Sequence, residues 1–283
     1  MNIQILLVPY DSGHPNLRMG RGPEHFIKNG LVQALQSVGH EVSVQTVEAE
    51  SGFRSEVKTQ FELYRSLARH VFEAKRNGKF PLILSGNCGA TVSVIAAAGT
   101  NQPGVIWFDT HGEFNTPETT TSGFLDGMGL AIATGRCWQK LAASIPDFRP
   151  IPGRNILLLG GHDFDEGERE RLEGAGVTVI DAGAISQMGI QDAIHSAMPA
   201  LLQVAQEAHL HIDLDVLNPK EAPANGFVTE DAGLSMDELT EAVDRIKGSV
   251  KITSATIASY DPQYDPQGKT LQAGLRLMQQ ITD

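Results

Sequence analysis

The stretch DTHGEFNTPETTTSG, residues 109–123, comes directly after the apolar run Gly104–Phe108. A short apolar run bounded by polar residues is typical of a buried strand. Side chains of a strand alternate between its two faces, so the odd-numbered Asp109, His111 and Glu113 are expected to point the same way, into a small volume beyond the strand's carboxyl end. Carboxylates and imidazoles are common metal ligands. The stretch therefore predicts a buried strand that ends in a functional site.

Strands and helices are expected to alternate along the whole chain. Apolar runs of strand length are followed by segments with apolar residues at helical spacing, and the first helix is expected to run from Pro23 through Leu35. This order predicts an α/β fold of three layers, α/β/α, with a mainly parallel central sheet. No linker or repeat divides the sequence, so residues 1–283 are expected to form one domain. The other expected elements are the strands Ile3–Val8, Glu41–Val47, Phe80–Leu84, Val105–Phe108, Asn155–Leu159, Val177–Ile180, Ala208–Leu217 and Val250–Ala258, and the helices Val57–Val71, Val92–Ala98, Ile190–Ala205 and Leu271–Met278.

The composition favours a globular protein of enzyme size. The chain has 283 residues, of which 41% are hydrophobic, so it can bury a large core. Its net charge of −12, without a basic cluster, argues against binding to nucleic acid or to an anionic membrane. Two cysteines, Cys88 and Cys137, cannot form a disulfide framework, and the N-terminal segment lacks the features of a signal peptide. We therefore expect a cytoplasmic protein without nucleic-acid or membrane partners.

A second acidic pair lies in HIDLDVLNP, residues 211–219. On a strand, Asp213 and Asp215 would point the same way, and two buried carboxylates are costly unless a cation or hydrogen bonds compensate them. For either acidic cluster alone, carboxylates that cap a helix or face water would be the favoured interpretation. Two such clusters favour a metal site, because ligands of parallel sheets bind beyond the carboxyl ends of the strands. The set Asp109, His111, Asp213 and Asp215 suits Mn²⁺ or Mg²⁺, and bridging carboxylates permit a two-metal site.

Several motifs resemble those of the arginase or ureohydrolase family. Residues 109–123 resemble the family's DAHxDxNTPxTTxSG, HIDLDVLNP resembles SxDxDxxDP, and SGNCG at residues 85–89 stands where the family has GGDHS. The resemblance implies the arginase-type fold and a pair of Mn²⁺ ions that activates hydroxide for attack on the carbon of a guanidinium or amidine group. By position, Asp109 and Asp213 would bridge the two ions. His111 and Asp215 would complete one metal site, and Asp109 and His111 are thereby expected to act in catalysis.

The other metal site departs from the family pattern. Cys88 replaces its usual histidine and Glu113 its usual aspartate. A thiolate is softer than Mn²⁺ prefers, so we expect this site to be weak, to be empty or to bind zinc. Alternatively, Cys88 only fills space at a turn between a strand and a helix, as buried free cysteines often do. Glu113 keeps the carboxylate and changes only its reach.

The amino-acid end of an arginase-like pocket is retained. By resemblance, the substrate's α-carboxylate would be held by Asn115, Thr120 and Ser122. The α-amino group would be held by acidic side chains of GHDFDEGE, namely Asp163, Asp165 and Glu168. Neutral donors suit a carboxylate, and acidic acceptors suit an ammonium group. Alternatively, Asp165 and Glu168 cap a helix at residues 167–173, and Thr120 and Ser122 are turn residues.

The reacting end of the pocket differs from arginases at two positions. Ser259 stands where the family has a glutamate that pairs with the guanidinium, and Asp126 stands where arginases have a histidine that shuttles protons. Unmodified arginine would lose a charge partner at Ser259, although Asp261 could compensate. Asp126 could act as the catalytic acid or base, or accept a hydrogen bond from an added hydroxyl or amine. With Cys88, the stretch HGxFNTPETTxxGxLxGM is most similar to the Nω-hydroxyarginine hydrolase branch.

These features lead us to expect hydrolysis of Nω-hydroxyarginine or another substituted arginine. One alternative is an amidinohydrolase of agmatine, a guanidino acid or formiminoglutamate. Another is a weakly active or inactive family member that binds a ligand or metal. The retained amino-acid end favours an α-amino acid over agmatine. The family resemblance also implies a homo-oligomer, a trimer or a hexamer.

Overall fold

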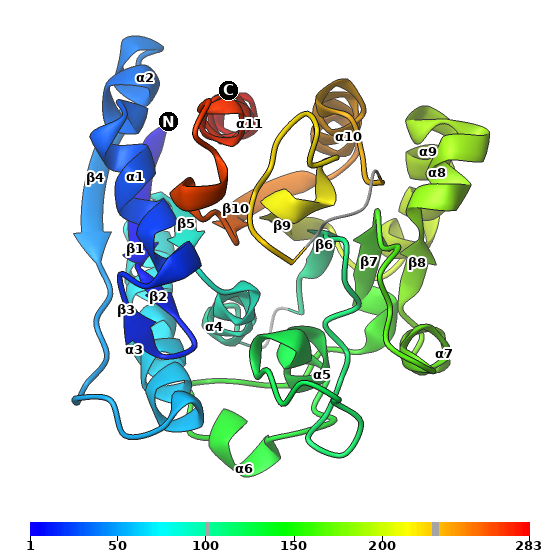
Figure 1. Cartoon of the computed structure of the whole chain (residues 1–283), viewed down its shortest axis with the longest axis horizontal. Helices are drawn as coiled ribbons and strands as arrows, with labels where there is room; N and C mark the ends of the chain where they lie inside the picture. The colour runs from blue at the N-terminus through cyan, green and yellow to red at the C-terminus, as the bar shows by residue number, and fades with distance from the viewer. Residues whose placement is uncertain (100–101, 228–231) are drawn as a thin grey trace.

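The computed structural model describes residues 1–99, 102–227 and 232–283. In this part of the chain, an eight-stranded sheet has the order β4-β1-β5-β10-β9-β6-β7-β8 (Figure 1). All neighbouring strands in it run parallel, which confirms the expected mainly parallel sheet. A short antiparallel hairpin of β2 and β3 lies outside it. The strands are β1 (Asn2–Val8), β2 (Tyr10–Asp11), β3 (His14–Pro15), β4 (Glu41–Thr46), β5 (Phe80–Ser85), β6 (Gly104–Phe108), β7 (Ile156–Leu159), β8 (Thr178–Ile180), β9 (Glu207–Asp213) and β10 (Lys251–Ala258).

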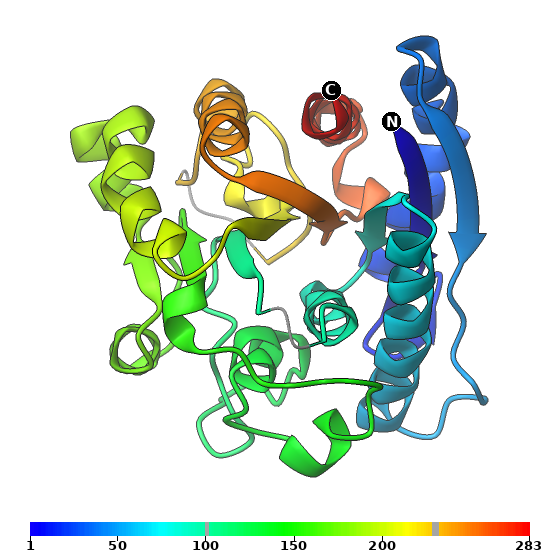
Figure 2. The same cartoon turned by 180° about the vertical axis from the view of Figure 1, so that it is seen from behind.

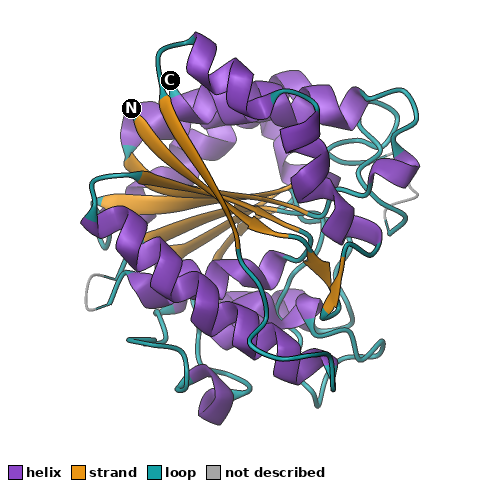
Figure 3. Ribbon diagram, turned by 90° about the vertical axis from the view of Figure 1, so that its left-hand side faces the viewer, coloured by secondary structure: helices purple, strands orange, loops and turns teal. Residues whose placement is uncertain are grey.

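Helices cover both faces of the sheet, which Figure 3 shows nearly edge-on. On one face, apolar residues of α1, α2, α9, α10 and α11 pack against the strands in one core cluster. On the other face, α3, α4 and α5 pack in two further clusters. This arrangement confirms the three-layer α/β/α fold (Figures 1 and 2). The helices are α1 (Gly22–Lys28), α2 (Leu31–Ser37), α3 (Glu56–Arg76), α4 (Thr91–Ala97), α5 (Gly129–Ala133), α6 (Gln139–Ala142), α7 (Glu168–Gly174), α8 (Ala182–Met188), α9 (Ile190–Leu202), α10 (Met236–Ser249) and α11 (Lys269–Thr282), with 3₁₀ turns η1 (Arg18–Arg21), η2 (Cys88–Ala90), η3 (Asp126–Met128), η4 (Gly153–Asn155), η5 (Leu214–Val216) and η6 (Pro262–Tyr264).

The expected helix from Pro23 through Leu35 is two helices, so this prediction was wrong in its continuity. Helix α1 ends at Lys28, and Gly30 adopts a left-handed conformation with φ of 93° before α2 begins. Glycine takes this conformation without steric cost, so the chain turns here while Phe26 and Leu35 remain in the same core cluster. Helix α9 also stops at Leu202, three residues earlier than its apolar spacing indicated.

The sheet order brings distant polar segments to one edge. Strand β9 lies between β10 and β6, and β5 pairs with the other side of β10. The carboxyl ends of these strands are therefore neighbours, although those of β5 and β10, at Ser85 and Ala258, lie more than half the chain apart in sequence. Asp109 and Ser259 come directly after β6 and β10, Asn87 lies two residues beyond β5, and Asp213 is the last residue of β9. No helix in the described residues is long and apolar enough to cross a membrane.

Candidate metal and substrate site

Asp109 lies at the centre of the polar residues at this edge. Its carboxylate belongs to three groups of potential metal ligands, and within each group all ligand atoms lie within 4.8 Å of one another. Asp109 itself is completely buried. The three groups are Asp109 with His111 and Glu113, Asp109 with Asp213 and Asp215, and Asp109 with Cys88 and His211. The first two groups contain residues predicted from the sequence, whereas His211 was not predicted.

The convergence of Asp109, His111 and Glu113 is confirmed, but strand alternation is not its cause. Strand β6 ends at Phe108, and the chain turns immediately afterwards. The backbone N–H of His111 donates to Asp109 Oδ1 at 2.7 Å, and Glu113 has a left-handed backbone with φ of 55°. Trp107 Nε1 donates to Asp109 Oδ2 at 2.8 Å and fixes the other side of the carboxylate. A tight turn, rather than an extended strand, therefore brings the three side chains together.

The predicted strand through Leu217 is also wrong at its end. Strand β9 stops at Asp213, and the 3₁₀ turn η5 begins at Leu214. Asp213 Oδ1 accepts a hydrogen bond from the backbone N–H of Asp215 at 2.8 Å, so Asp213 caps this turn. Capping was the alternative interpretation of the acidic pair. The structure shows both features, because Asp213 caps the turn and also lies in the cluster around Asp109. One carboxylate oxygen of Asp213 fixes the backbone, and the other faces the site.

Several buried polar atoms of the cluster have no hydrogen-bond partner among the described residues, namely Glu113 Oε2, Asp215 Oδ1 and His211 Nε2. An unpaired polar atom in a protein interior costs roughly 1–3 kcal/mol, and more when it is charged. Bound cations would satisfy three such atoms around one carboxylate, since oxygen and imidazole nitrogen are metal ligands. The donor set therefore fits the divalent ions expected from the sequence.

The electrostatics of the cluster also favour a cation. Burial, followed by the nearby carboxylates of Asp109 and Asp126, raises the pKa of Glu113 well above its ordinary value. Burial and the charge of Asp215 likewise raise the pKa of Asp213. Burial lowers the pKa of His111, but the facing carboxylates outweigh it and bring that pKa well above its usual range. Without metal, the cluster therefore retains protons that a divalent ion would displace.

Cys88 lies in this polar cluster rather than in a purely apolar setting. Its Sγ donates to Asp213 Oδ2 at 2.8 Å and lies 3.3 Å from Ser259 Oγ, which also donates to Asp213 Oδ2 at 2.6 Å. Burial raises the pKa of the thiol well above its ordinary value, and the nearby carboxylates add to this effect. Cys88 therefore faces the carboxylate of Asp213 directly, although it also packs in the apolar cluster with Trp107 and Val92.

Asp126 holds the turn that carries Cys88. Its carboxylate accepts hydrogen bonds from Asn87 Nδ2 and from the backbone N–H groups of Cys88 and Gly89, at 2.8 to 2.9 Å. Burial raises the pKa of Asp126 to about 7, although these three donors oppose the shift. Both oxygens are engaged by the turn, so the contacts of Asp126 are those of a residue that positions Cys88.

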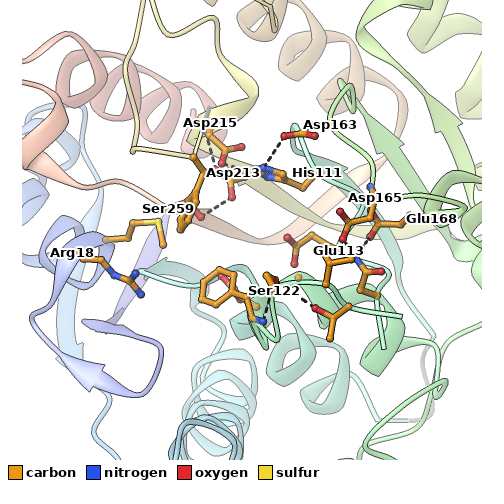
Figure 4. Close-up of a pocket in the computed structure, with 18 residues that line it drawn as sticks. Arg18, His111, Glu113, Ser122, Asp163, Asp165, Glu168, Asp213, Asp215 and Ser259 are labelled. Carbon is orange, nitrogen blue, oxygen red and sulfur yellow. Dashed lines mark hydrogen bonds and ion pairs between the residues drawn. The ribbon is translucent and has the colours of Figure 1, made fainter. Parts of the chain in front are cut away.

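A cavity of about 300 Å³ connects the acidic cluster to the predicted amino-acid end. In Figure 4, Asp213, Asp215 and His111 lie at one side of this space, and Asp165 and Glu168 lie at another. Most of the predicted substrate residues lie on its wall, together with Arg18, Met19, Phe124 and Phe227, which were not predicted. The full lining is Arg18, Met19, His111, Glu113, Asn115, Thr120, Thr121, Ser122, Phe124, Asp126, Gly127, Asp163, Asp165, Glu168, Asp213, Asp215, Phe227 and Ser259.

The amino-acid end is held together by its own hydrogen bonds. Asn115 Nδ2 donates to Asp165 Oδ2 at 2.8 Å, and Glu168 accepts from the backbone N–H groups of Phe114 and Asp165 at 2.8 and 3.0 Å. The N-cap of α7 is Gly167, so Asp165 does not cap that helix. Glu168 instead links the 114–115 segment to the start of α7. Asp165 remains on the cavity wall with an exposed side chain.

Thr120 and Ser122 are turn residues that also line the cavity. Thr120 Oγ1 accepts from the backbone N–H of Gly123 at 3.0 Å, and Ser122 Oγ accepts from that of Phe124 at 3.2 Å. The two hydroxyls lie 3.4 Å apart, so one can donate to the other and at least one proton stays available as a donor to a ligand. Asp261, by contrast, is buried and does not line the cavity. It caps η6 by accepting a hydrogen bond from the backbone N–H of Gln263. The expectation that Asp261 takes over from the missing glutamate is not supported by this position.

Some residues of the site were not predicted from the sequence, and only some of them could have been recognised from a sequence pattern. His211 lies two residues before Asp213, and strand alternation alone would have placed both on the same face. Arg18 gives no such signal, because its place depends on a paired contact with Asp11, whose two carboxylate oxygens it meets at 2.8 Å. Phe124 and Phe227 lie 5.7 Å apart between ring centroids and come from distant loops.

Comparison with known proteins agrees with this site. The family described as the Arginase family matches residues 1–282, so the chain belongs to the arginase family, hydrolases that act on C–N bonds of amidine groups. Arginase of Bacillus subtilis (strain 168) is 28% identical over 291 residues, which covers 99% of this chain and 97% of that protein. The crystal structure of arginase from Bacillus cereus has a TM-score of 0.90 at 26% identity and covers 99% of this chain and 98% of that chain. Formimidoylglutamase from Bacillus subtilis, at 19% identity with a TM-score of 0.76 and covering 99% and 85%, shares the fold.

Proposed function

We propose that this chain hydrolyses the C–N bond of a substituted guanidino group on an arginine-like α-amino acid, with Nω-hydroxyarginine as the first candidate. The observation that carries the proposal is the cavity that joins the acidic cluster around Asp109 to Asp165 and the hydroxyls of Thr120 and Ser122. A substrate with a reactive group at one end and an α-amino acid at the other matches both ends of this cavity.

Two divalent ions would be held at the reacting end. By the family resemblance, Asp109 and Asp213 would serve both ions, His111 and Asp215 would complete one site, and Cys88 and Glu113 would complete the other. The overlapping ligand groups around Asp109 support this assignment. The chemistry such ions supply is the activation of water as a nucleophile at neutral pH and the polarisation of the group attacked. Oxygen and imidazole ligands favour Mn²⁺ on the His111 side, and the thiol favours a softer ion such as zinc on the Cys88 side.

The other end of the cavity would orient the substrate. The exposed carboxylates of Asp163 and Asp165 are acceptors for an α-ammonium group, and the hydroxyls of Thr120 and Ser122 are donors for an α-carboxylate. Agmatine lacks the carboxylate and would offer these hydroxyls no acceptor for their protons. An α-amino acid therefore satisfies this end better than agmatine or a guanidino acid.

The preference for a substituted guanidino group rests on Ser259 and Asp126. The hydroxyl of Ser259 carries no charge that could pair with a guanidinium, and it donates its hydrogen bond to Asp213. Its short side chain leaves room beside the cluster for a hydroxyl or amine substituent. Asp126 lies on the same wall, and its Oδ1, which accepts one hydrogen bond from the backbone, can accept a second one from that substituent. A substituent also lowers the basicity of the group, which reduces the cost of the missing carboxylate.

Turnover measured side by side tests the proposal. The metal-loaded protein would be given Nω-hydroxyarginine, arginine, agmatine and formiminoglutamate, with Mn²⁺ and with Zn²⁺, and we expect the first to be hydrolysed fastest. Asp165→Asn should raise KM about tenfold, since one charge-assisted hydrogen bond contributes roughly 1.5 kcal/mol, while the neighbouring exposed Glu166→Gln should not. Equal turnover of agmatine would contradict the substrate assignment.

Absence of both bound metal and turnover of every guanidino compound would contradict the enzymatic role. That result would favour the alternative of a family member that binds a ligand or metal without catalysis. The observation that supports this alternative is that Asp126 and Ser259 already form hydrogen bonds within the protein. The single domain, the cytoplasmic location and the trimer or hexamer stay predictions.

A further inference from the structure

We propose that His211 is a metal ligand, and that it supplies the nitrogen that the Cys88 side lost when cysteine replaced histidine. The Cys88 side would then be a site of thiolate, imidazole and carboxylate ligands that prefers Zn²⁺ or Co²⁺ to Mn²⁺. This inference rests on the proposed metallohydrolase function, but it concerns binding alone. It assigns a role to a residue that the motif comparison leaves without one.

The position of His211 points into the cluster. It lies on β9, two residues before Asp213, so the two side chains extend from the same face of the strand. A ring nitrogen of His211, Cys88 Sγ and a carboxylate oxygen of Asp109 all lie within 4.8 Å of one another. The exposed fraction is 0% for His211 and 1% for Cys88, so this group is closed to solvent.

The ring of His211 is fixed and has one free nitrogen. It stacks on Trp107 with 3.7 Å between ring centroids and an interplanar angle of 21°. Its Nδ1 lies 2.8 Å from Thr91 Oγ1, whereas its Nε2 is buried without a hydrogen-bond partner among the described residues. Metal-binding histidines commonly use one nitrogen for the ion and the other for an oxygen that orients the ring. Thr91 provides that oxygen here.

His209 provides an internal comparison on the same strand. It lies two residues before His211, on the same face, and is also buried. Its Nδ1 lies 2.9 Å from Ser254 Oγ, and its Nε2 lies 3.1 Å from Thr256 Oγ1. Both of its nitrogens therefore have partners, as expected for a histidine that only packs in a core. The unpaired Nε2 of His211 is what distinguishes a ligand from a packing residue.

The chemistry of the three ligands determines which ion they prefer. Thiolate with imidazole and carboxylate is a set that selects zinc-like ions, whereas Mn²⁺ prefers oxygen. Zinc binding would also displace the proton of the Cys88 thiol, which the apo protein shares with Asp213. The proton leaves to solvent, and the thiolate charge is balanced by the ion.

Metal binding by matched variants tests the role of His211. Wild type, His211→Asn and His209→Asn would be equilibrated in Zn²⁺ and Co²⁺ buffers, with bound metal counted per chain and folding checked by circular dichroism. We expect Co²⁺ protein to show the near-ultraviolet absorption of a thiolate–cobalt bond, which Cys88→Ser abolishes. His211→Asn should weaken binding at the Cys88 side by at least about tenfold. His209→Asn should bind as wild type does. Equal affinity in wild type and His211→Asn would overturn the proposal.

X-ray absorption decides the question if His211→Asn does not fold. In His111→Asn protein loaded with Zn²⁺, His111 is gone, so sulfur at about 2.3 Å together with imidazole nitrogen at about 2.0 Å would identify Cys88 and His211 as ligands. A zinc shell without imidazole would overturn the proposal. Both measurements are made without substrate. A lack of turnover would therefore count against the proposed reaction and leave this ligand assignment standing, and the reverse also holds.

Discussion

The two sides of the acidic cluster differ in what they face. His111 has 30% of its side chain exposed and lines the cavity with Asp215, where substrate and water can reach it. Cys88 and His211 are buried behind Asp109 and Asp213, against the apolar layer of α4 and α5. The open side keeps the residues of the family motif, and the buried side changes them. We therefore expect a ligand exchange on the buried side to change which ion is held there while His111 and Asp215 keep their places in the cavity wall.

The shared residues connect the two sides. Asp109 belongs to every ligand group, while Asp213 accepts hydrogen bonds from both Cys88 and Ser259. A change in the ion on the buried side therefore acts on the open side through these carboxylates. We infer that the two sides prefer different metal ions but do not bind them independently. The following predictions test this difference, from the largest expected effect to the smallest.

Replacing the shared carboxylate should have the largest effect. Asp109→Asn removes one charge from all three ligand groups, so we expect metal to be lost from both sides and turnover to fall on the order of a thousandfold or more. Metal content and kcat/KM would be measured together. Glu166→Gln is the control, because Glu166 is exposed and does not line the cavity. Retention of one full equivalent of metal in Asp109→Asn would show that the two sides do not depend on this carboxylate.

Replacing the Cys88 thiol should change the metal affinity of the two sides of the cluster to different extents. Cys88→His introduces the histidine that the family pattern has at this position, and we expect the Cys88 side to gain Mn²⁺ affinity by about tenfold. The affinity of the His111 side should change by a smaller factor, through the shared carboxylates. The larger ring costs roughly 1–3 kcal/mol of stability in this packed position. Cys137→Ser, at the other buried cysteine, is the control. Unchanged Mn²⁺ content in Cys88→His would indicate that Cys88 serves only to pack.

Neutralising Glu113 should have opposite effects with and without metal. In the apo protein its buried Oε2 has no partner among the described residues, and burial with neighbouring carboxylates raises its pKa. Glu113→Gln should therefore stabilise the apo protein and destabilise the metal-loaded one, each by roughly 1–3 kcal/mol. Urea unfolding with and without chelator measures both, with the exposed Glu118→Gln as control. The same sign in both states would argue that Glu113 does not face an ion.

The sequence predicts the layers and the chemistry of the open side, because these depend on local patterns. Apolar runs indicate strands, and Asp109, His111, Asp213 and Asp215 follow two of them in recognisable motifs. Their convergence was predicted for the wrong local reason, since the turn at Glu113 and the capping of η5 by Asp213 depend on backbone hydrogen bonds that a residue pattern does not display.

The buried side could not be predicted in the same way. A single histidine on an apolar strand usually packs in the core, and only the stacking on Trp107 and the unpaired Nε2 distinguish His211 from His209. Likewise, nothing in the segment SGFLDGM indicates that Asp126 accepts hydrogen bonds from the backbone N–H groups of Cys88 and Gly89, which lie 38 and 37 residues away in sequence. Such contacts follow from the strand order β5-β10-β9-β6, which brings segments distant in sequence to one edge.

The pH dependence of stability gives the smallest effect and tests the histidine comparison. Burial lowers the pKa of His209 to about 3, so the folded protein keeps this imidazole neutral. Between this value and the unfolded value near 6.5 the unfolded chain binds more protons, and the stability due to neutral His209 is lost as pH falls through that range. At pH 5.5 the loss is about 1 kcal/mol.

His209→Gln isolates this term in metal-free protein. Several carboxylates with raised pKa values act in the opposite direction over the same range, but they are common to wild type and variant. We expect the free energy of unfolding to fall less in His209→Gln than in wild type, by about 1 kcal/mol, when pH goes from 7.5 to 5.5. The measurement is urea unfolding at both pH values. An identical fall in the two proteins would mean that His209 takes up a proton in the folded state, which its hydrogen bonds to Ser254 and Thr256 do not require.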